Sequence, residues 1–326
     1  MYIGVHGLLT LVITIIVLQG TITAFLPKPN KHFSCQRLGP SFESMINSMK
    51  TDSSTTLTHV DGIKDIANSY STFLLDMWGV MHDGTNPYEG VIDTVKKLKE
   101  DDKKLIILSN SSKRKENSIK ALKRLGFDPE EDFEKIITSG EVSYRMLSGD
   151  PSLQCSNWNV LSDLISSNKK NVFVFGSGDG DEQYCSSCGW TLTSMEDADL
   201  ILARGTFTIN DGSGNIVTKK EDEKEYYDAL NEALETAAAR KVPMLVSNPD
   251  KVRPDKGLPP MPGAIADSYE NLLGGDRNIV KRIGKPYPEV YELALQGICD
   301  PSDVIMVGDA LVSFNHYDLG INEERD

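Results

Sequence analysis

Residues 73–90 read FLLDMWGVMHDGTNPYEG, and this stretch decides how the fold is interpreted. Three apolar residues lead directly into a single carboxylate, Asp76, and turn-forming residues follow. An apolar run that ends in an acid and a turn is typical of a buried strand in an α/β protein, where strand ends carry the groups that bind ligands. We therefore expect a strand that ends at Asp76.

From about residue 61 the sequence alternates short aliphatic runs with amphipathic segments of helical length. The apolar runs TFLLD, KLIILSN and KIITSG are followed by the helix-like segments GVIDTVKKLKED, RKENSIKALKRLGF and EVSYRML. This alternation predicts βαβ crossovers, and therefore a parallel sheet with helices on both faces. Ligands bind beyond the carboxyl ends of such strands, and Asp76, Ser109 and Ser139 stand at these ends.

The alternation starts again in residues 150–252, with NVFVFG, ADLILA, a long helical segment and VPMLVSN. Near the C-terminus, IMVGD again has the form of a core strand that ends in an acid, Asp309. The simplest interpretation is a second α/β unit inserted into the first. The GSGDG run at 176–180 lacks the full G-x-G-x-x-G pattern of a dinucleotide-binding loop.

The charge balance argues against nucleic acid as the main partner. The 326 residues carry 34 basic and 48 acidic side chains, for a formal net charge of −14. A nucleic-acid backbone would be repelled by this excess of acids. An anionic substrate would need a local positive site, such as a metal ion, a lysine or a helix N-terminus.

The N-terminal segment predicts entry into the secretory route. Residues 1–24 contain an apolar run at 8–18, which fits a signal peptide with Ala24 before the cut, and an uncleaved membrane anchor is the alternative. Residues 25–60 are expected to be a transit-type or linker segment. The junction TITAFLP resembles the bipartite presequences of algae with complex plastids, which implies the plastid, whereas ordinary secretion is the alternative.

Five cysteines give no even-numbered disulfide framework. Cys185 and Cys188 form a C-x-x-C pair, for which structural thiols, a regulatory dithiol and half of a metal site are the alternatives. Zinc is disfavoured because no second C-x-x-C or histidine pair accompanies it.

Four positions resemble the motifs of the haloacid dehalogenase-like hydrolases when taken together and in order. They are Asp76, Ser109 with Asn110, Lys285 in GKP, and Asp309 in MVGDA. The resemblance extends from about residue 70 to 310. DMWGVMHDG, the long insertion, and SNPD followed by PGAIADSYENLLGG are similar to class IIA, the p-nitrophenyl phosphatase-like branch.

The resemblance implies a fold and a domain order. The fold is α/β, with a doubly wound parallel sheet in a Rossmann-like core and an inserted α/β cap domain. The core is expected in residues 61–149 and 253–326, and the cap in residues 150–252.

The resemblance also implies the hydrolysis of small phosphate monoesters. Asp76 would attack phosphorus and form an aspartyl-phosphate. Mg²⁺ would be held by the carboxylates of Asp76 and Asp309 and by the backbone carbonyl of Trp78. Ser109 and Lys285 would bind the phosphoryl oxygens. The partner is then a small phosphorylated metabolite, and contact with a membrane is expected only if the N-terminal segment stays uncleaved.

Further substrate contacts are assigned by the same resemblance. Asn110, Asn248 and Asp250 are the candidates, with an ordinary loop turn as the alternative for the NPD sequence.

Trp78 departs from the family pattern. The family places a second aspartate there, which protonates the leaving oxygen and then activates water. Without it, the substrate could have a good leaving group, or His82 or Asp83 could replace the acid. The chain could also be a catalytically silent phosphate-binding or regulatory homologue, or a metal-free dehalogenase-like enzyme.

The C-terminus departs as well. The family continues after Asp309 with another acid, whereas this chain has Phe314 and stops 17 residues after Asp309. A further strand with its crossover helix needs about 30 residues. We therefore expect a truncated core whose last strand leaves a sheet edge uncovered.

Overall fold

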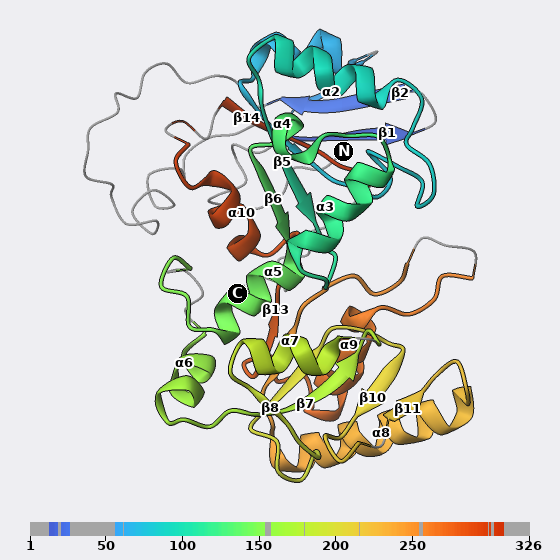
Figure 1. Ribbon diagram of the computed structural model, residues 1–326, viewed down its shortest axis with the longest axis vertical. Helices are drawn as coiled ribbons and strands as arrows, with labels where there is room; N and C mark the ends of the chain where they lie inside the picture. Colours follow the sequence, from blue (N-terminus) through green and yellow to red (C-terminus); the bar gives the residue numbers. More distant parts are fainter. Residues whose placement is uncertain are drawn as a thin grey trace, which may run out of the picture. The chain divides into compact units, whose positions relative to one another are not determined.

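The computed structural model describes ten stretches of the chain, which form two compact units (Figure 1). The first unit takes Met1–Leu108, Ile119–Ile136 and Ala294–Asp326, and the second takes Ser109–Ser118 and Ile137–Leu293. The described stretches are residues 13–18, 21–26, 56–60, 62–153, 158–178, 180–214, 216–253, 257–298, 300 and 303–309. Phe314, and with it the predicted truncation, lies outside them.

The first sheet has the strand order β3-β2-β1-β14-β4-β5-β6. Its centre is parallel, because β14 pairs in parallel with β4 and β4 pairs in parallel with β5. The strands are β1 (Ile13–Leu18), β2 (Thr21–Leu26), β3 (Thr56–Val60), β4 (Thr72–Leu75), β5 (Lys104–Ser109), β6 (Lys135–Thr138) and β14 (Val304–Val307).

The edge of β14 is paired, so the prediction of an uncovered edge beside the last strand is wrong. β1 pairs in parallel with β14, and β2 and β3 continue the sheet in antiparallel order. The sequence of β1, ITIIVL, is rich in β-branched residues, which favour strands. β1 lies within residues 1–24, the expected signal peptide, and β2 extends past its end. The signal peptide itself stays a prediction. Among the described residues, no helix has the length and apolarity to cross a membrane.

Both faces of the central strands are buried, which is typical of a parallel sheet. Alternate residues of β4, β5 and β14 pack with α2 and α3 in one hydrophobic cluster. Between β3 and β6 the chain forms the short 3-10 helices η1 (Ile63–Asp65) and η2 (Ala67–Ser69) and the helices α2 (Val91–Glu100), α3 (Lys115–Arg124) and α4 (Pro129–Asp132).

The second sheet is mixed, with the order β11-β10-β7-β9-β12-β13 and β8 beside β7. β7, β9, β12 and β13 run parallel, whereas β10 is antiparallel to β7 and to β11. The strands are β7 (Asn171–Gly176), β8 (Thr191–Leu192), β9 (Leu200–Ala203), β10 (Thr208–Asn210), β11 (Ile216–Thr218), β12 (Met244–Val246) and β13 (Val280–Arg282).

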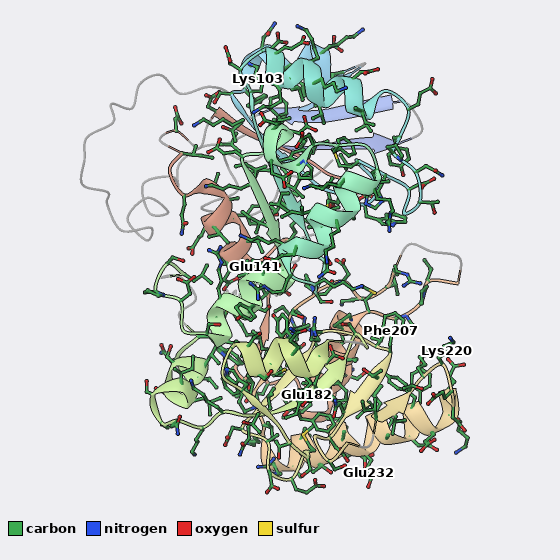
Figure 2. All side chains as sticks on the ribbon, in the orientation of Figure 1. Lys103, Glu141, Glu182, Phe207, Lys220 and Glu232 are labelled. Atoms are coloured by element: carbon green, nitrogen blue, oxygen red, sulfur yellow. The ribbon has the colours of Figure 1, made fainter. Side chains whose placement is uncertain are left out.

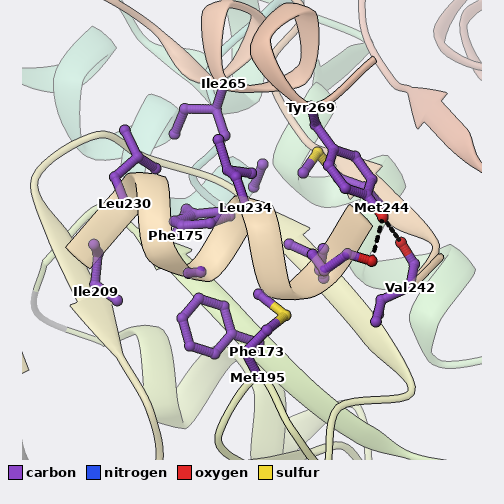
Figure 3. Packing of buried hydrophobic residues seen from close by; sticks show 14 of the residues in the cluster. Phe173, Phe175, Met195, Ile209, Leu230, Leu234, Val242, Met244, Ile265 and Tyr269 are labelled. Carbon is purple, nitrogen blue, oxygen red and sulfur yellow. Dashed lines mark hydrogen bonds between the residues drawn. The ribbon is translucent and has the colours of Figure 1, made fainter. Parts of the chain in front are cut away.

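The core of the second unit lies between this sheet and two helices (Figure 3). Tyr269 of α9 is buried there, and its hydroxyl donates to the carbonyls of Ala237 at 3.2 Å and Val242 at 2.6 Å. The buried polar end of the tyrosine thereby ties α9 to the end of α8. The helices are α5 (Ser139–Leu147), α6 (Asn159–Ser166), α7 (Asp181–Ser187), α8 (Glu223–Arg240), α9 (Pro262–Leu272) and α10 (Pro288–Leu295).

The predicted α/β fold with a parallel core sheet and a second α/β unit is confirmed. The compact units, however, divide the chain at points other than the predicted 149/150 and 252/253. β13 pairs with β12 in the second sheet, so residues up to 293 group with the second unit. The alternating pattern identifies strands, but it does not specify which sheet a strand joins.

Candidate active site

In the first unit, Asp76 and Asp309 follow two neighbouring parallel strands. Asp76 comes directly after β4, and its backbone N–H donates to the carbonyl of Val307 on β14 at 2.9 Å. Asp309 stands two residues beyond the end of β14. Both side chains are half-buried. The structure therefore brings the first and last predicted site acids to the same edge of the sheet.

Gly79 shapes the space around Asp309. It has φ +81°, and a Cβ built on it would lie 1.8 Å from Oδ2 of Asp309. The carboxylate of Asp309 therefore lies against the bare backbone of Gly79, in the loop that begins at Asp76. Only glycine leaves room for that approach.

The donors at this edge fit a hard divalent cation. Two carboxylates and the backbone carbonyl of Trp78, in the same loop, are oxygen ligands of the kind that Mg²⁺ takes together with substrate oxygens and water. Among the described residues, no group of three or more His, Cys, Asp and Glu side chains could hold a metal ion by itself. A cation here would depend on oxygens from the substrate and from water.

The loop after Asp76 closes on itself through Trp78 and His82. The Gly79 N–H donates to the His82 carbonyl at 2.9 Å, and the Gly84 N–H donates to His82 Nδ1 at 2.9 Å. A Cβ on Gly84 would lie 3.2 Å from Nε1 of Trp78, so the indole lies beside that glycine. Both aromatic side chains are parts of the turn.

Neither predicted substitute for the missing acid is well placed to donate a proton. His82 is buried, which lowers its pKa, and its Nδ1 accepts the Gly84 N–H, so the proton of the neutral ring is on Nε2. The exposed Asp83 accepts N–H bonds from Asn86 and Thr85, each at 2.8 Å, which lower its pKa. A neutral imidazole and an ionised carboxylate are both poor general acids.

In the second unit, the structure brings together the residues of the second and third predicted motifs. The Ser139 hydroxyl, at the start of α5, donates to the Ser109 carbonyl at 3.2 Å. The Asn110 side chain bonds to the backbone of Lys285 and to the Asp250 carboxylate. Four predicted site residues, Ser109, Asn110, Asp250 and Lys285, thus lie in one connected hydrogen-bond network.

Asn248 shapes the loop that precedes Asp250, and its contact with substrate stays a prediction. It is buried, and its side-chain oxygen accepts the backbone N–H of Asp250 at 2.9 Å. This bond closes an Asx turn. The loop-turn alternative is therefore supported for Asn248, whereas Asp250 is exposed and reaches Asn110.

The segment that carries Ser109 and Asn110 is anchored on α5 by contacts that sequence reasoning missed. The buried Glu141, labelled in Figure 2, accepts from Arg114 Nε at 2.5 Å and from Arg145 Nε at 3.3 Å. Burial opposes ionisation of Glu141, but the hydrogen bonds and charges of the two arginines outweigh it and hold its pKa below the usual value. The Thr138 hydroxyl also donates to the Lys113 carbonyl at 2.7 Å. The sequence does place Glu141 and Arg145 four residues apart, a spacing that favours an ion pair on one helix face. This spacing could have indicated the contact.

The two cysteines of the C-x-x-C pair are free and buried in α7 and at its end. Burial raises the pKa of the Cys185 thiol far above its usual value and that of Cys188 to about 11. Thiolate is the reactive form, so these thiols are expected to be inert. The structure favours structural cysteines over a regulatory dithiol.

Comparison with known proteins adds two family matches. A haloacid dehalogenase-like hydrolase model matches residues 73–191, and a second model with the same description matches residues 195–312. Together they span more than half of the chain.

Two relatives and two solved structures agree with these matches. An acid sugar phosphatase of Staphylococcus haemolyticus is 27% identical, over 74% of this chain and 78% of the relative. A 4-nitrophenylphosphatase of Schizosaccharomyces pombe is 26% identical, over 76% of this chain and 79% of the relative.

The solved structures show the fold. A haloacid dehalogenase-like hydrolase from Brucella suis has a TM-score of 0.55 at 21% identity, over 76% of this chain and 80% of that chain. A 4-nitrophenylphosphatase from Thermotoga maritima has a TM-score of 0.53 at 21% identity, with the same coverage. Taken with the order of the motifs and the placement of Asp76 and Asp309 just after two adjacent parallel strands, the matches show that this chain belongs to the haloacid dehalogenase-like hydrolases, in class IIA.

Proposed function

We propose that this chain hydrolyses small phosphate monoesters through an aspartyl-phosphate on Asp76. The observation that carries the proposal is the placement of Asp76 and Asp309 at the ends of adjacent parallel strands, with Gly79 leaving room for the second carboxylate. The names of the two relatives, a sugar phosphatase and a 4-nitrophenylphosphatase, support the same class of substrate.

The proposed reaction has two steps on one carboxylate. The Asp76 carboxylate attacks phosphorus, an oxygen–phosphorus bond forms, and the bond from phosphorus to the leaving oxygen breaks. Water then attacks the phosphorus of the aspartyl-phosphate, which releases inorganic phosphate and regenerates the carboxylate. The leaving oxygen takes its proton from solvent.

The remaining residues would assist through charge and hydrogen bonds. When bound, Mg²⁺ would reduce the repulsion between the carboxylates and the phosphoryl group, and Asp76, Asp309 and the Trp78 carbonyl are the residues that would hold it. The Ser109 hydroxyl accepts the Ser111 N–H at 3.3 Å, which leaves its own proton to donate to a phosphoryl oxygen. Lys285 would neutralise the charge that develops there.

The D-x-W-G-V-x-H-D-G loop favours substrates with good leaving groups. Trp78 supplies no acid, and the hydrogen bonds of His82 and Asp83 hold both in the turn. General acid–base assistance is worth roughly 10² to 10⁴ in rate, and its absence matters least when the leaving oxygen is already stable as an anion. Aryl and acyl phosphates are therefore the proposed substrates.

The first test is Mg²⁺-dependent hydrolysis of p-nitrophenyl phosphate by the full chain. Activity should disappear in chelator and in Asp76→Asn, and should persist in Asp163→Asn, which changes an exposed acid on α6. Tight phosphate binding without hydrolysis would overturn the proposal in favour of a silent, phosphate-binding homologue. Activity that survives chelation would point to metal-free, dehalogenase-like chemistry. Plastid targeting, with secretion as the alternative, stays a separate prediction.

A further inference from the structure

The Asn110 side chain uses both of its N–H donors and its oxygen within the protein. Its Nδ2 donates to Asp250 Oδ1 at 2.9 Å and to the Lys285 carbonyl at 3.1 Å. Its Oδ1 accepts the Lys285 N–H at 2.6 Å. An amide has two donor hydrogens, so none remains to donate to a phosphoryl oxygen of a substrate.

The orientation of the amide follows from chemistry. The backbone N–H of Lys285 is a donor and must face the oxygen of Asn110. The carboxylate of Asp250 and the carbonyl of Lys285 are acceptors and must face the nitrogen. One side chain thus binds both the N–H and the C=O of residue 285, which fixes the backbone from which the lysine ammonium extends.

We propose that Asn110 is a positioning residue that holds Lys285 in its catalytic place, and not a substrate ligand. This inference rests on the proposed function of Lys285, and it replaces the earlier assignment of Asn110 to substrate binding. Asn110 would act by fixing the loop at residues 283–287, so its effect on the reaction would pass through Lys285.

The contacts around the loop support this role. Its ends are held elsewhere: the Ile283 N–H donates to the Val246 carbonyl at 2.8 Å, and Lys281 forms an ion pair with the buried Glu289 at the start of α10. Asn110 holds the middle of the loop. There, Gly284 has φ +128°, and a Cβ on it would lie 2.7 Å from Asn110 Oδ1. The glycine lets the amide approach the backbone that closely.

The direct test is hydrogen exchange at the Lys285 amide, which needs no enzymatic activity. In Asn110→Ala the exchange should become about tenfold faster, as expected for the loss of one hydrogen bond. Exchange at the Ile283 amide, which bonds to Val246, should stay unchanged. That result would show that the substitution does not act by general unfolding. Asn231→Ala, an exposed asparagine on α8, is the matched control. Unchanged exchange at Lys285 would overturn the proposal whether or not the chain is a phosphatase.

Kinetics then separate positioning from substrate binding. With p-nitrophenyl phosphate, Asn110→Ala should lower kcat by at least about tenfold and change KM by less than about twofold. In a Lys285→Ala background, the same substitution should change kcat by less than about twofold, because the residue through which it acts is gone. A rise in KM of equal size in both backgrounds would show that Asn110 binds substrate and would overturn the proposal.

A charge swap gives a third, independent readout. Asn110→Asp keeps the acceptor for the Lys285 N–H but places a carboxylate against Asp250. Adding Asp250→Asn restores a donor–acceptor pair between the two side chains. The double variant should recover part of the kcat lost in Asn110→Asp, and the absence of any recovery would contradict the proposed network.

Discussion

Trp78 and His82 belong to the turn that follows Asp76, and their contacts decide what they can do in a reaction. The indole lies beside Gly84, and the His82 ring accepts the Gly84 N–H. These side chains hold the loop whose Gly79 borders the Asp309 carboxylate. The loop is therefore built around the contact of Gly79 with Asp309, where we propose that a cation binds, and it carries no group that is ready to protonate a leaving oxygen.

His82→Asn tests this assignment. The asparagine side-chain oxygen can take over the position of Nδ1 and accept the Gly84 N–H, so kcat on p-nitrophenyl phosphate should stay within about threefold of wild type, whereas loss of a general acid would cost roughly 10² or more. His82→Leu, which removes the acceptor, should lower the unfolding free energy by about 1–3 kcal/mol. A loss of kcat in His82→Asn at unchanged stability would show that the imidazole takes part in proton transfer.

Gly79→Ala should weaken the proposed binding of Mg²⁺ at the sheet edge that carries Asp76 and Asp309. The new Cβ would overlap the Asp309 carboxylate, so Mg²⁺ affinity measured by calorimetry and kcat should each fall by at least about tenfold, the size typical of a disturbed metal site.

The matched control is Gly90→Ala. Gly90 also has a positive φ, of 73°, but a Cβ there meets nothing within 4 Å. Both variants therefore carry the backbone strain of about 1–2 kcal/mol, and only the first carries the clash. Equal Mg²⁺ affinity in the two variants would mean that Asp309 does not depend on Gly79.

At the scale of elements, α5 anchors the segment that carries Ser109 and Asn110. Glu141 binds Arg114 of that segment and Arg145 of its own helix, and the Gly140 N–H donates to the Ser111 carbonyl at 2.9 Å. Gly140 approaches the segment so closely that a Cβ would lie 2.1 Å from the Ser112 carbonyl oxygen. The second motif is thus positioned by one buried carboxylate and a tight backbone contact.

Glu141→Gln should lower the unfolding free energy by about 2 kcal/mol, because it leaves two arginines without their buried partner. Glu130→Gln breaks an exposed pair with Lys123 and should cost clearly less, because an exposed ion pair contributes little to stability. Urea unfolding measures both. Equal costs would show that burial of the Glu141 pair contributes nothing to stability.

The same pair predicts a pH dependence. The pKa of Glu141 is lowered in the folded state, so its stabilisation is complete above the ordinary glutamate pKa of about 4.3 and is lost as pH falls through the folded-state pKa. Between pH 6 and pH 3, wild type should therefore lose more stability than Glu141→Gln. Parallel pH profiles for the two proteins would contradict this contribution.

At the scale of the whole molecule, the sequence predicted the α/β class, the strand that ends at Asp76 and the order of the four motifs. These features are local: an apolar run followed by an acid needs no knowledge of distant contacts. The membership of β13 in the second sheet, the pairing of β1 with β14, and the contact of Asn110 with Lys285 join residues far apart in sequence. Hydrophobic periodicity does not encode such partners, and therefore these features had to come from the structure.

Acid quenching during turnover tests whether Asp76 carries the phosphoryl group. The full chain is mixed with an acyl phosphate and Mg²⁺, quenched within the first turnovers, digested and mapped by mass spectrometry. Phosphate is expected on the peptide that contains Asp76, and none on that peptide in Asp76→Asn. Hydrolysis without phosphate on that peptide, or with phosphate on another residue, would contradict this role of Asp76.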